Sequence, residues 1–141
     1  MKLNKGKKAL VLNKNKMARL IAISDIHGCF DTFYELCIKK IDLKKSDKLI
    51  LLGDYIDRGG KSREVIDFII DLKGKGFDIT PLSGNHEAML VDAYNNYEML
   101  PLWYLNSGIT TLDSFNLTDI REIGKRYFSR FPFDRCFCCC L

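Results

Sequence analysis

Residue types able to bind metals and phosphate gather in three short stretches, "SDIHG", "GDYIDRGG" and "SGNHE", each of which follows an apolar run. They offer oxygen and nitrogen ligands and no thiolate, a set that suits Mn²⁺, Fe or Zn²⁺ rather than a structural zinc site. The candidate site residues are Asp25, His27, Asp54, Asp57, Arg58, Asn85 and His86.

Both histidines of the chain, His27 and His86, lie in these stretches. A lone histidine is more often a surface or core side chain with a satisfied hydrogen bond than a ligand. Here two histidines occur with three aspartates, an asparagine and an arginine, and this combination favours a site. The Asp-x-His spacing of Asp25 and His27 also places both side chains on one side of an extended backbone.

The elements that must position these residues follow from hydrophobic periodicity. Short apolar runs predict three strands, and helical spacing between them predicts helices, with Asp31 or Thr32 capping the first helix, Ser62 capping the second and Gly74 closing it. The predicted strands cover 18–24, 47–53 and 77–84, and the predicted helices cover 30–40, 61–76 and a segment from His86 onwards.

The β-α-β-α-β order predicts an α/β fold with a largely parallel sheet and helices on both faces. In such sheets, ligands bind beyond the carboxyl ends of the strands. The three polar stretches should therefore meet at one edge of the sheet.

The 141 residues fit one domain with a modest core. No apolar run approaches the roughly 20 residues of a membrane helix, and the basic N-terminus lacks the apolar stretch of a secretory signal. We therefore expect a soluble, cytoplasmic protein with no membrane partner.

The net charge of +4 comes from residues 1–16, which hold six lysines and no acid, whereas residues 17–141 carry a net charge of −2. No basic cluster lies in the folded part, so no nucleic-acid partner is expected. Residues 1–16 are interpreted as a disordered basic arm or a start-codon artefact with Met17 as the alternative start. An arm that binds nucleic acid or anionic lipid is the other interpretation.

Four of the six cysteines crowd into "RCFCCCL". Adjacent cysteines cannot all reach one tetrahedral zinc ion, and the prenylation pattern is imperfect because the two residues after Cys138 are not aliphatic. Residues 133–141 are therefore interpreted as an aberrant Cys-rich tail from a frameshift or premature stop, rather than a thiol cluster for metal or lipid attachment.

In their order and spacing, "SDIHG", "GDYIDRG" and "GNHE" resemble the motifs GDxHG, GDxxDRG and GNHE of the calcineurin-like metallophosphoesterases. The closest resemblance is to the phosphoprotein phosphatase branch, which includes bacterial and phage Ser/Thr phosphatases and diadenosine-tetraphosphate hydrolases. Ser24 replaces the first glycine. "WYLNSGITTLDSF" (103–115) also resembles a segment of bacterial members. The resemblance assigns 17–132 to a partial domain of this family.

The resemblance implies a centre of two divalent metal ions. It implies that Asp25, His27 and Asp54 hold one ion, and that Asp54 bridges to a second ion joined by Asn85. Resembling enzymes add two further histidines to the second ion, and this chain has none after His86. The second metal site is therefore expected to be incomplete here.

The resemblance also implies catalytic roles. Arg58 would clamp the phosphoryl oxygens, His86 would act as the general acid for the leaving oxygen, and Asp57 would orient His86. The fold implied is the N-terminal half of a β-sandwich flanked by helices. Because half a sandwich leaves one sheet face open, we expect marginal stability or aggregation of the isolated chain.

The function expected from these residues is a metal-dependent phosphoesterase that hydrolyses phosphate monoesters, resembling Ser/Thr protein phosphatases. Its substrate would be a phosphorylated protein or a small phosphoester. The alternatives are a non-catalytic fragment with one metal cluster and a dinucleoside-polyphosphate hydrolase. A nucleotide-binding α/β module is disfavoured because no strand is followed by a glycine-rich phosphate loop.

Overall fold

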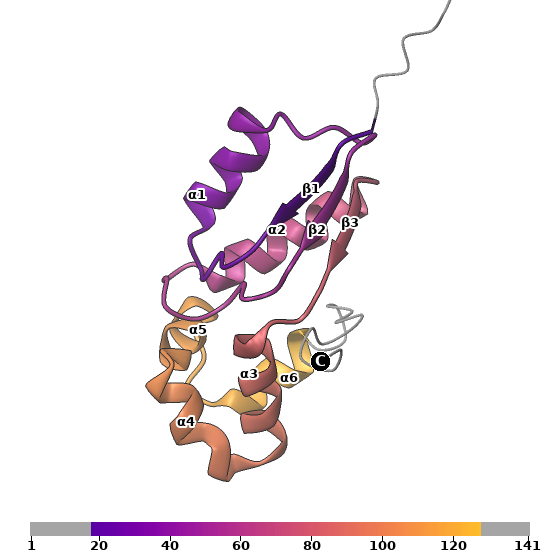
Figure 1. The fold of residues 1–141 in the computed structure, drawn as a ribbon. Coiled ribbons are helices and arrows are strands. Elements are labelled where there is room, and N and C mark those ends of the chain that lie inside the picture. Colours follow the sequence, from indigo (N-terminus) through magenta and orange to yellow (C-terminus); the bar gives the residue numbers. More distant parts are fainter. Residues whose placement is uncertain (1–17, 128–141) are drawn as a thin grey trace, which may run out of the picture.

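A computed structural model describes residues 18–127 of the chain, which contain one parallel sheet with the strand order β1-β2-β3 (Figure 1). Ile23 is paired with Leu51, and Leu51 with Pro81, so the three strands end at the same level. The predicted parallel α/β arrangement is confirmed, with each strand shorter than predicted. The strands are β1 (Leu20–Ile23), β2 (Lys48–Leu51) and β3 (Asp78–Pro81).

Helices follow each strand of the sheet. The predicted helix 30–40 is divided, because its second half forms a π-helical turn over Leu36–Lys40. The α-helices are α1 (Phe30–Glu35), α2 (Ser62–Gly74), α3 (Asn85–Asn95), α4 (Leu100–Leu105), α5 (Gly108–Ser114) and α6 (Ile120–Tyr127), and Tyr97–Met99 forms a short 3₁₀ helix, η2. The helices labelled α3, α4, α5 and α6 lie beyond the carboxyl ends of the strands (Figure 1).

Helices α1 and α2 lie on the same face of the sheet. Their aromatic side chains contact one another, with 5.6 Å between the ring centres of Phe33 and Phe68 and 5.3 Å between those of Tyr34 and Phe68. Right-handed crossovers that advance in one direction across a sheet place successive helices on one side. The prediction of helices on both faces is therefore wrong for residues 18–127.

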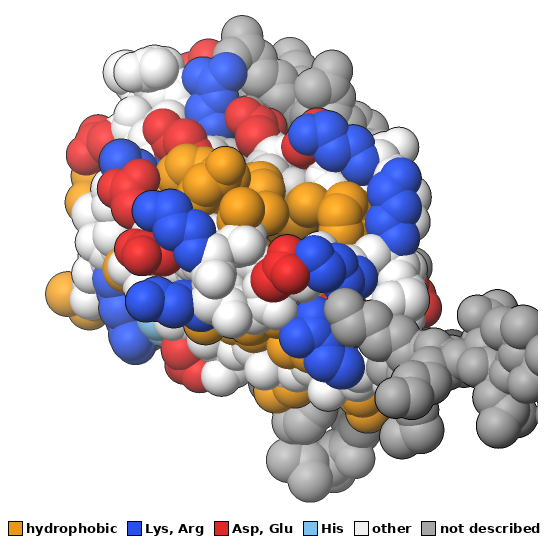
Figure 2. All heavy atoms as spheres, turned by 90° about the horizontal axis from the view of Figure 1, so that it is seen from above, with side chains coloured by type: hydrophobic (Ala, Val, Ile, Leu, Met, Phe, Trp, Pro, Cys, Tyr) orange, Lys and Arg blue, Asp and Glu red, His pale blue; other side chains and the backbone are white. Residues whose placement is uncertain are grey.

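The two faces of the sheet differ in burial. Leu49, Leu51 and Ile79 point toward the helices and are buried. On the opposite face of β1, Leu20 is 70% exposed and Ala22 is exposed as well. Seen from above, hydrophobic side chains also form a band between charged ones on the molecular surface (Figure 2). The described residues thus leave apolar surface open to solvent.

The predicted side-chain caps are not formed. Cys29 and Lys61 occupy the N-cap positions of α1 and α2 without a capping hydrogen bond from their side chains. Asp31 instead pairs with Lys61 at 2.6 Å. The hydroxyl of Ser62 points inward and accepts the backbone N–H of Asp57 at 3.2 Å. The predictions that Asp31 or Thr32 caps α1 and that Ser62 caps α2 are therefore wrong. The side chains of Asp31 and Ser62 instead contact residues of other segments, and such contacts compete with local capping.

The basic arm 1–16 and the Cys-rich tail 133–141 lie outside the described residues, so their interpretations stay predictions. Within residues 18–127, every helix is too short or too polar to traverse a lipid bilayer.

Candidate functional site

The loops after β1 and β2 carry the candidate site residues in an unusual backbone conformation. Left-handed φ angles occur at Asp25 (54°), His27 (44°), Asp54 (56°), Asp57 (67°) and Arg58 (65°). Each non-glycine residue in this region costs on the order of 1–3 kcal/mol and persists only where the surroundings fix it. The backbone strain of the described residues is thus concentrated at the sequence-predicted site.

Backbone hydrogen bonds tie these two loops together. The N–H of His27 donates to the carbonyl of Asp54 at 2.8 Å, and the N–H of Gly28 donates to the carbonyl of Tyr55 at 2.8 Å. In the other direction, the N–H of Gly59 donates to the carbonyl of His27 at 2.9 Å. The first and second loops therefore form one hydrogen-bonded unit that supports the strained conformations.

Glu87, at the third position of α3, joins the second and third loops. Its buried carboxylate accepts the backbone N–H groups of Asp54 (2.8 Å), Tyr55 (2.8 Å) and Gly84 (2.9 Å). Burial raises the pKa of Glu87, and the amide hydrogen bonds oppose that shift. No role of Glu87 was predicted from the sequence, although a Glu at this helix position is typical of a residue that binds the N-cap amide.

The turn from β3 into α3 lies directly on the Asp54 carboxylate. A Cβ atom at Gly84 would lie 2.2 Å from Asp54 Oδ1, so only glycine allows this approach. The N–H of His86 donates to Asp54 Oδ1 at 3.1 Å. The Asn85 amide nitrogen, when it faces Asp54, lies 3.2 and 3.0 Å from the two carboxylate oxygens. Asp54 and Asn85 are thus brought together from separate loops.

The first loop presents a histidine whose ring is oriented by a backbone hydrogen bond. The Nδ1 atom of His27 lies 3.0 Å from the carbonyl oxygen of Ile56, and because a carbonyl only accepts, Nδ1 carries the proton. The free lone pair is then on Nε2, which lies 3.8 Å from Asp25 Oδ1. A histidine oriented through its other nitrogen in this way is characteristic of metal sites.

The residues present fit a divalent metal ion. Ligand atoms of His27, Asp54 and His86 lie within 4.8 Å of one another, in the one such group found among residues 18–127. Asp25 and Asn85 flank this group through their contacts with His27 and Asp54. His86, which sequence analysis assigned to acid catalysis, thus lies close enough to serve as a ligand.

A buried histidine–aspartate pair adjoins the metal cluster. His86 Nδ1 lies 2.8 Å from Asp57 Oδ2, and the side chains are 1% and 0% exposed. Burial raises the pKa of Asp57, and hydrogen bonds from Thr111, His86 and Trp103 oppose this shift. Arg58 Nη2 lies 3.4 Å from His86 Nε2. The arrangement points one imidazole nitrogen at a carboxylate and the other toward Arg58 and the metal ligands.

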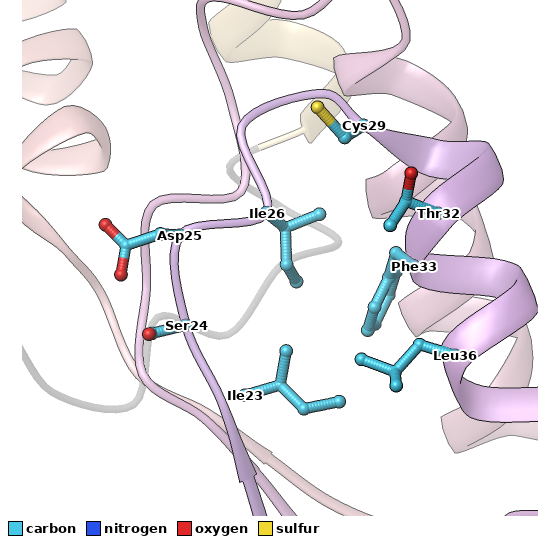
Figure 3. Close-up of a pocket in the computed structure, with 8 residues that line it drawn as sticks. All are labelled: Ile23, Ser24, Asp25, Ile26, Cys29, Thr32, Phe33 and Leu36. Carbon is cyan, nitrogen blue, oxygen red and sulfur yellow. The ribbon is translucent and has the colours of Figure 1, made fainter. Parts of the chain in front are cut away.

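A pocket of about 260 Å³ lies between the end of β1 and α1. Figure 3 shows apolar side chains from both segments facing one another, with the Asp25 carboxylate pointing away from the helix. His27, Asp54 and His86 do not line it, so it lies beside the site rather than forming it. Its lining residues are Ile23, Ser24, Asp25, Ile26, Cys29, Thr32, Phe33 and Leu36.

Curated relatives share parts of this chain. It is 42% identical over 72 residues to the symmetrical bis(5'-nucleosyl)-tetraphosphatase of Buchnera aphidicola, covering 51% of this chain and 25% of that protein. It is 36% identical over 77 residues to the zinc-dependent endopolyphosphatase of Saccharomyces cerevisiae, covering 54% of this chain and 23% of that protein. It is 30% identical over 101 residues to serine/threonine-protein phosphatase 2 of Salmonella typhimurium, covering 69% of this chain and 42% of that protein.

The matched region thus amounts to about a quarter of the length of the first two relatives and less than half of the third. The family described as calcineurin-like phosphoesterase matches residues 18–138, which include all three loops of the site. This match agrees with the parallel α/β fold and with the cluster of candidate metal ligands. The chain belongs to the calcineurin-like phosphoesterase family.

Proposed function

We propose that this site hydrolyses phosphate esters with the help of divalent metal ions. The observation that carries the proposal is the convergence of the His27, Asp54 and His86 ligand atoms within 4.8 Å, with Arg58 beside His86. Cationic and metal-binding groups at one edge of a sheet complement the charge of a phosphoryl group.

The residues proposed to hold metal are Asp25, His27, Asp54 and Asn85, with Mn²⁺, Fe and Zn²⁺ all compatible with these donors. Bound metal would neutralise phosphoryl charge and lower the pKa of water. With two histidines in the chain, a second ion would have fewer nitrogen ligands than the resemblance implies. The protein's own contribution is to hold the two carboxylates and the His27 Nε2 atom at fixed positions.

Arg58 is proposed to bind the phosphoryl oxygens, because it is an exposed residue and a planar donor pair matches two such oxygens. His86 is proposed to donate a proton from Nε2 to the leaving oxygen. Asp57 would support this role, because its carboxylate lies 2.8 Å from Nδ1 and stabilises a positive imidazolium.

Two substrate classes are candidates. A phosphate monoester on a protein is supported by the likeness to serine/threonine-protein phosphatase 2 over 69% of this chain. A dinucleoside polyphosphate is supported equally by the likeness to symmetrical bis(5'-nucleosyl)-tetraphosphatases. Both reactions use the same displacement at phosphorus, so the substrate must be decided by measurement.

The first experiment measures hydrolysis of p-nitrophenyl phosphate by the purified chain with Mn²⁺, Fe²⁺ or Zn²⁺, beside an Asp54→Asn variant. We expect metal-dependent turnover that the variant loses. A phosphoserine peptide and diadenosine tetraphosphate, assayed in parallel, then identify the substrate class. Folded protein that turns over none of these compounds would contradict the proposal.

Calorimetric titration with Mn²⁺ separates binding from chemistry. Binding without turnover would favour the alternative of a non-catalytic fragment that keeps one metal cluster. A His86→Asn variant tests the role of His86 directly. We expect it to retain metal binding and lose turnover, and a comparable loss of metal affinity would instead make His86 a ligand.

A further inference from the structure

The Asp57 carboxylate receives three side-chain donors from distant parts of the chain. Its Oδ2 atom accepts the Trp103 indole N–H at 2.9 Å and lies 2.8 Å from His86 Nδ1. Its Oδ1 atom accepts the Thr111 hydroxyl at 2.6 Å. All four side chains belong to buried residues, so these bonds form where water cannot replace them.

The direction of the Thr111 bond is fixed by a second contact. The backbone N–H of Asp57 donates to Thr111 Oγ1 at 2.9 Å, so that hydroxyl is already an acceptor. Its own proton therefore goes to a different acceptor, and Asp57 Oδ1 at 2.6 Å is the closest oxygen. Thr111 thus holds both the backbone and the carboxylate of a residue whose φ angle is 67°.

The Trp103 indole is fixed by close packing against the backbone at Gly108. A Cβ atom at Gly108 would lie 2.3 Å from Trp103 Cδ2, so the start of α5 lies against the indole ring and requires glycine there. Trp103 is completely buried on α4. Helices α4 and α5 therefore place two neutral donors on Asp57 at fixed positions, although both follow Asp57 by more than forty residues.

We propose that Trp103 and Thr111 are positioning residues of the reaction, which hold the Asp57 carboxylate so that His86 keeps its proton on Nδ1 and presents Nε2 to the substrate. With neutral donors on both oxygens, Asp57 cannot rotate away from His86 without breaking a buried hydrogen bond. Arg58 lies 3.4 Å from Nε2 and can only donate, so Nε2 is the nitrogen left free to take up a proton from solvent, which His86 then passes to the leaving oxygen while Asp57 stabilises the intervening imidazolium. This inference rests on the proposed function, because it supports the proton-donor role of His86.

The tautomer of His86 gives a readout that needs no turnover. Long-range ¹H–¹⁵N spectra of the metal-free chain, recorded where the imidazoles are neutral, distinguish Nδ1–H from Nε2–H, and only two histidines contribute. We expect His86 in the wild type to be the Nδ1–H tautomer. Thr111→Val removes the hydroxyl at nearly constant shape and should produce a mixture of tautomers, whereas Thr111→Ser should restore the wild-type spectrum.

Thr110→Val is the matched control, because the Thr110 hydroxyl donates to the carbonyl of Ser107 and not to Asp57. It should leave the tautomer unchanged. Circular dichroism checks that each variant folds. If Thr111→Val does not fold, Trp103→Phe is judged by the same spectrum. A folded Thr111→Val or Trp103→Phe protein with the wild-type tautomer would overturn the inference.

Turnover gives a second readout when the chain is active. A misplaced proton donor slows substrates with poor leaving groups more than those with good ones. Thr111→Val should therefore lower turnover of phenyl phosphate roughly 10- to 100-fold, with a much smaller loss for 2,4-dinitrophenyl phosphate. Equal losses on both would indicate a merely structural role. An inactive wild type would refute the proposed function and leave the spectra to decide this inference.

Discussion

At the scale of single residues, the site depends on two buried carboxylates, those of Asp57 and Glu87, which bind different kinds of hydrogen-bond donor. Asp57 faces side-chain donors and supports His86, whereas Glu87 faces backbone amides and fixes the loops that carry Asp54. A carboxylate without hydrogen bonds would be costly to bury. Both carboxylates are hydrogen-bonded, and these bonds offset part of the cost of burying them beside strained backbone.

Glu87→Gln tests the structural carboxylate. The amide keeps the shape but turns one acceptor into an N–H₂ donor that faces the backbone N–H groups of Asp54, Tyr55 and Gly84. Leaving a buried donor unsatisfied costs about 1–3 kcal/mol. Chemical denaturation should show a loss of this size, and the exposed Glu64→Gln should show almost none. Equal stability of both variants would contradict this assignment.

The site residues that could be predicted from the sequence differ from those that could not in how far along the chain their partners lie. Asp54, His86 and their neighbours follow strands within short motifs, so residue type and spacing suffice to select them. Trp103 and Thr111 contact Asp57 across 46 and 54 positions, a separation that no local pattern encodes. Their segment could be identified by resemblance, but its role required the three-dimensional contacts.

At the scale of elements, side-chain hydrogen bonds connect the segments that lead into β1 and β2, at the end of the sheet opposite the site. Arg19, which precedes β1, donates from Nε to the Asp47 carboxylate before β2 at 3.0 Å, and the Lys44 N–H donates to the same carboxylate at 2.8 Å. The hydrogen bond from Arg19 is the main cause that lowers the pKa of Asp47 well below its usual range.

This shift predicts a pH dependence of stability. Because the pKa of Asp47 is lowered in the folded state, its contribution is complete above the unfolded value of about 4 and is lost as the pH falls. Asp47→Asn should therefore lower the unfolding midpoint at neutral pH, and its difference from wild type should shrink in acid. Thermal melts between neutral and acidic pH measure this. Asp78→Asn, at an exposed position, is the control. If the difference in unfolding midpoint between Asp47→Asn and wild type did not depend on pH, the lowered pKa of Asp47 would not be its cause.

The types and order of the elements through the start of α3 could be predicted from the sequence. The face of the sheet on which each helix lies and the residues that cap the helices could not. Apolar runs identify strands because burial requires them, whereas the side of the sheet on which α2 lies depends on crossover handedness and strand order together. Ser62 has the residue type of a helix cap, yet its hydroxyl bonds with Asp57 and Thr111 instead. Tertiary contacts of this kind are invisible in a local pattern.

At the scale of the whole molecule, the described residues have a covered and an open side. Helices α1 and α2 bury one face of the sheet, while Leu20 is 70% exposed and Leu52 is 37% exposed on the other. On its outer edge, β1 has no strand partner among residues 18–127. Exposed apolar edges of this kind promote association between chains.

Leu20→Lys should therefore weaken self-association of the purified chain. A lysine on an edge strand opposes pairing with another chain, and a side chain this exposed contributes little to the core. Light scattering against protein concentration should show less association, with an unchanged unfolding midpoint. The control is Leu105→Lys, because Leu105 is 85% exposed but lies at the end of α4. An equal effect of the control would show that any exposed leucine suffices.

Trp103 is the only tryptophan in the chain, and its indole N–H is bonded to the Asp57 carboxylate. The ultraviolet emission of the protein therefore arises almost entirely beside the Asp57–His86 pair. A change in the colour or intensity of that emission reports on this one place rather than on an average over the fold. The molecule thus carries its own optical probe, with which the integrity of the site can be followed without any attached dye.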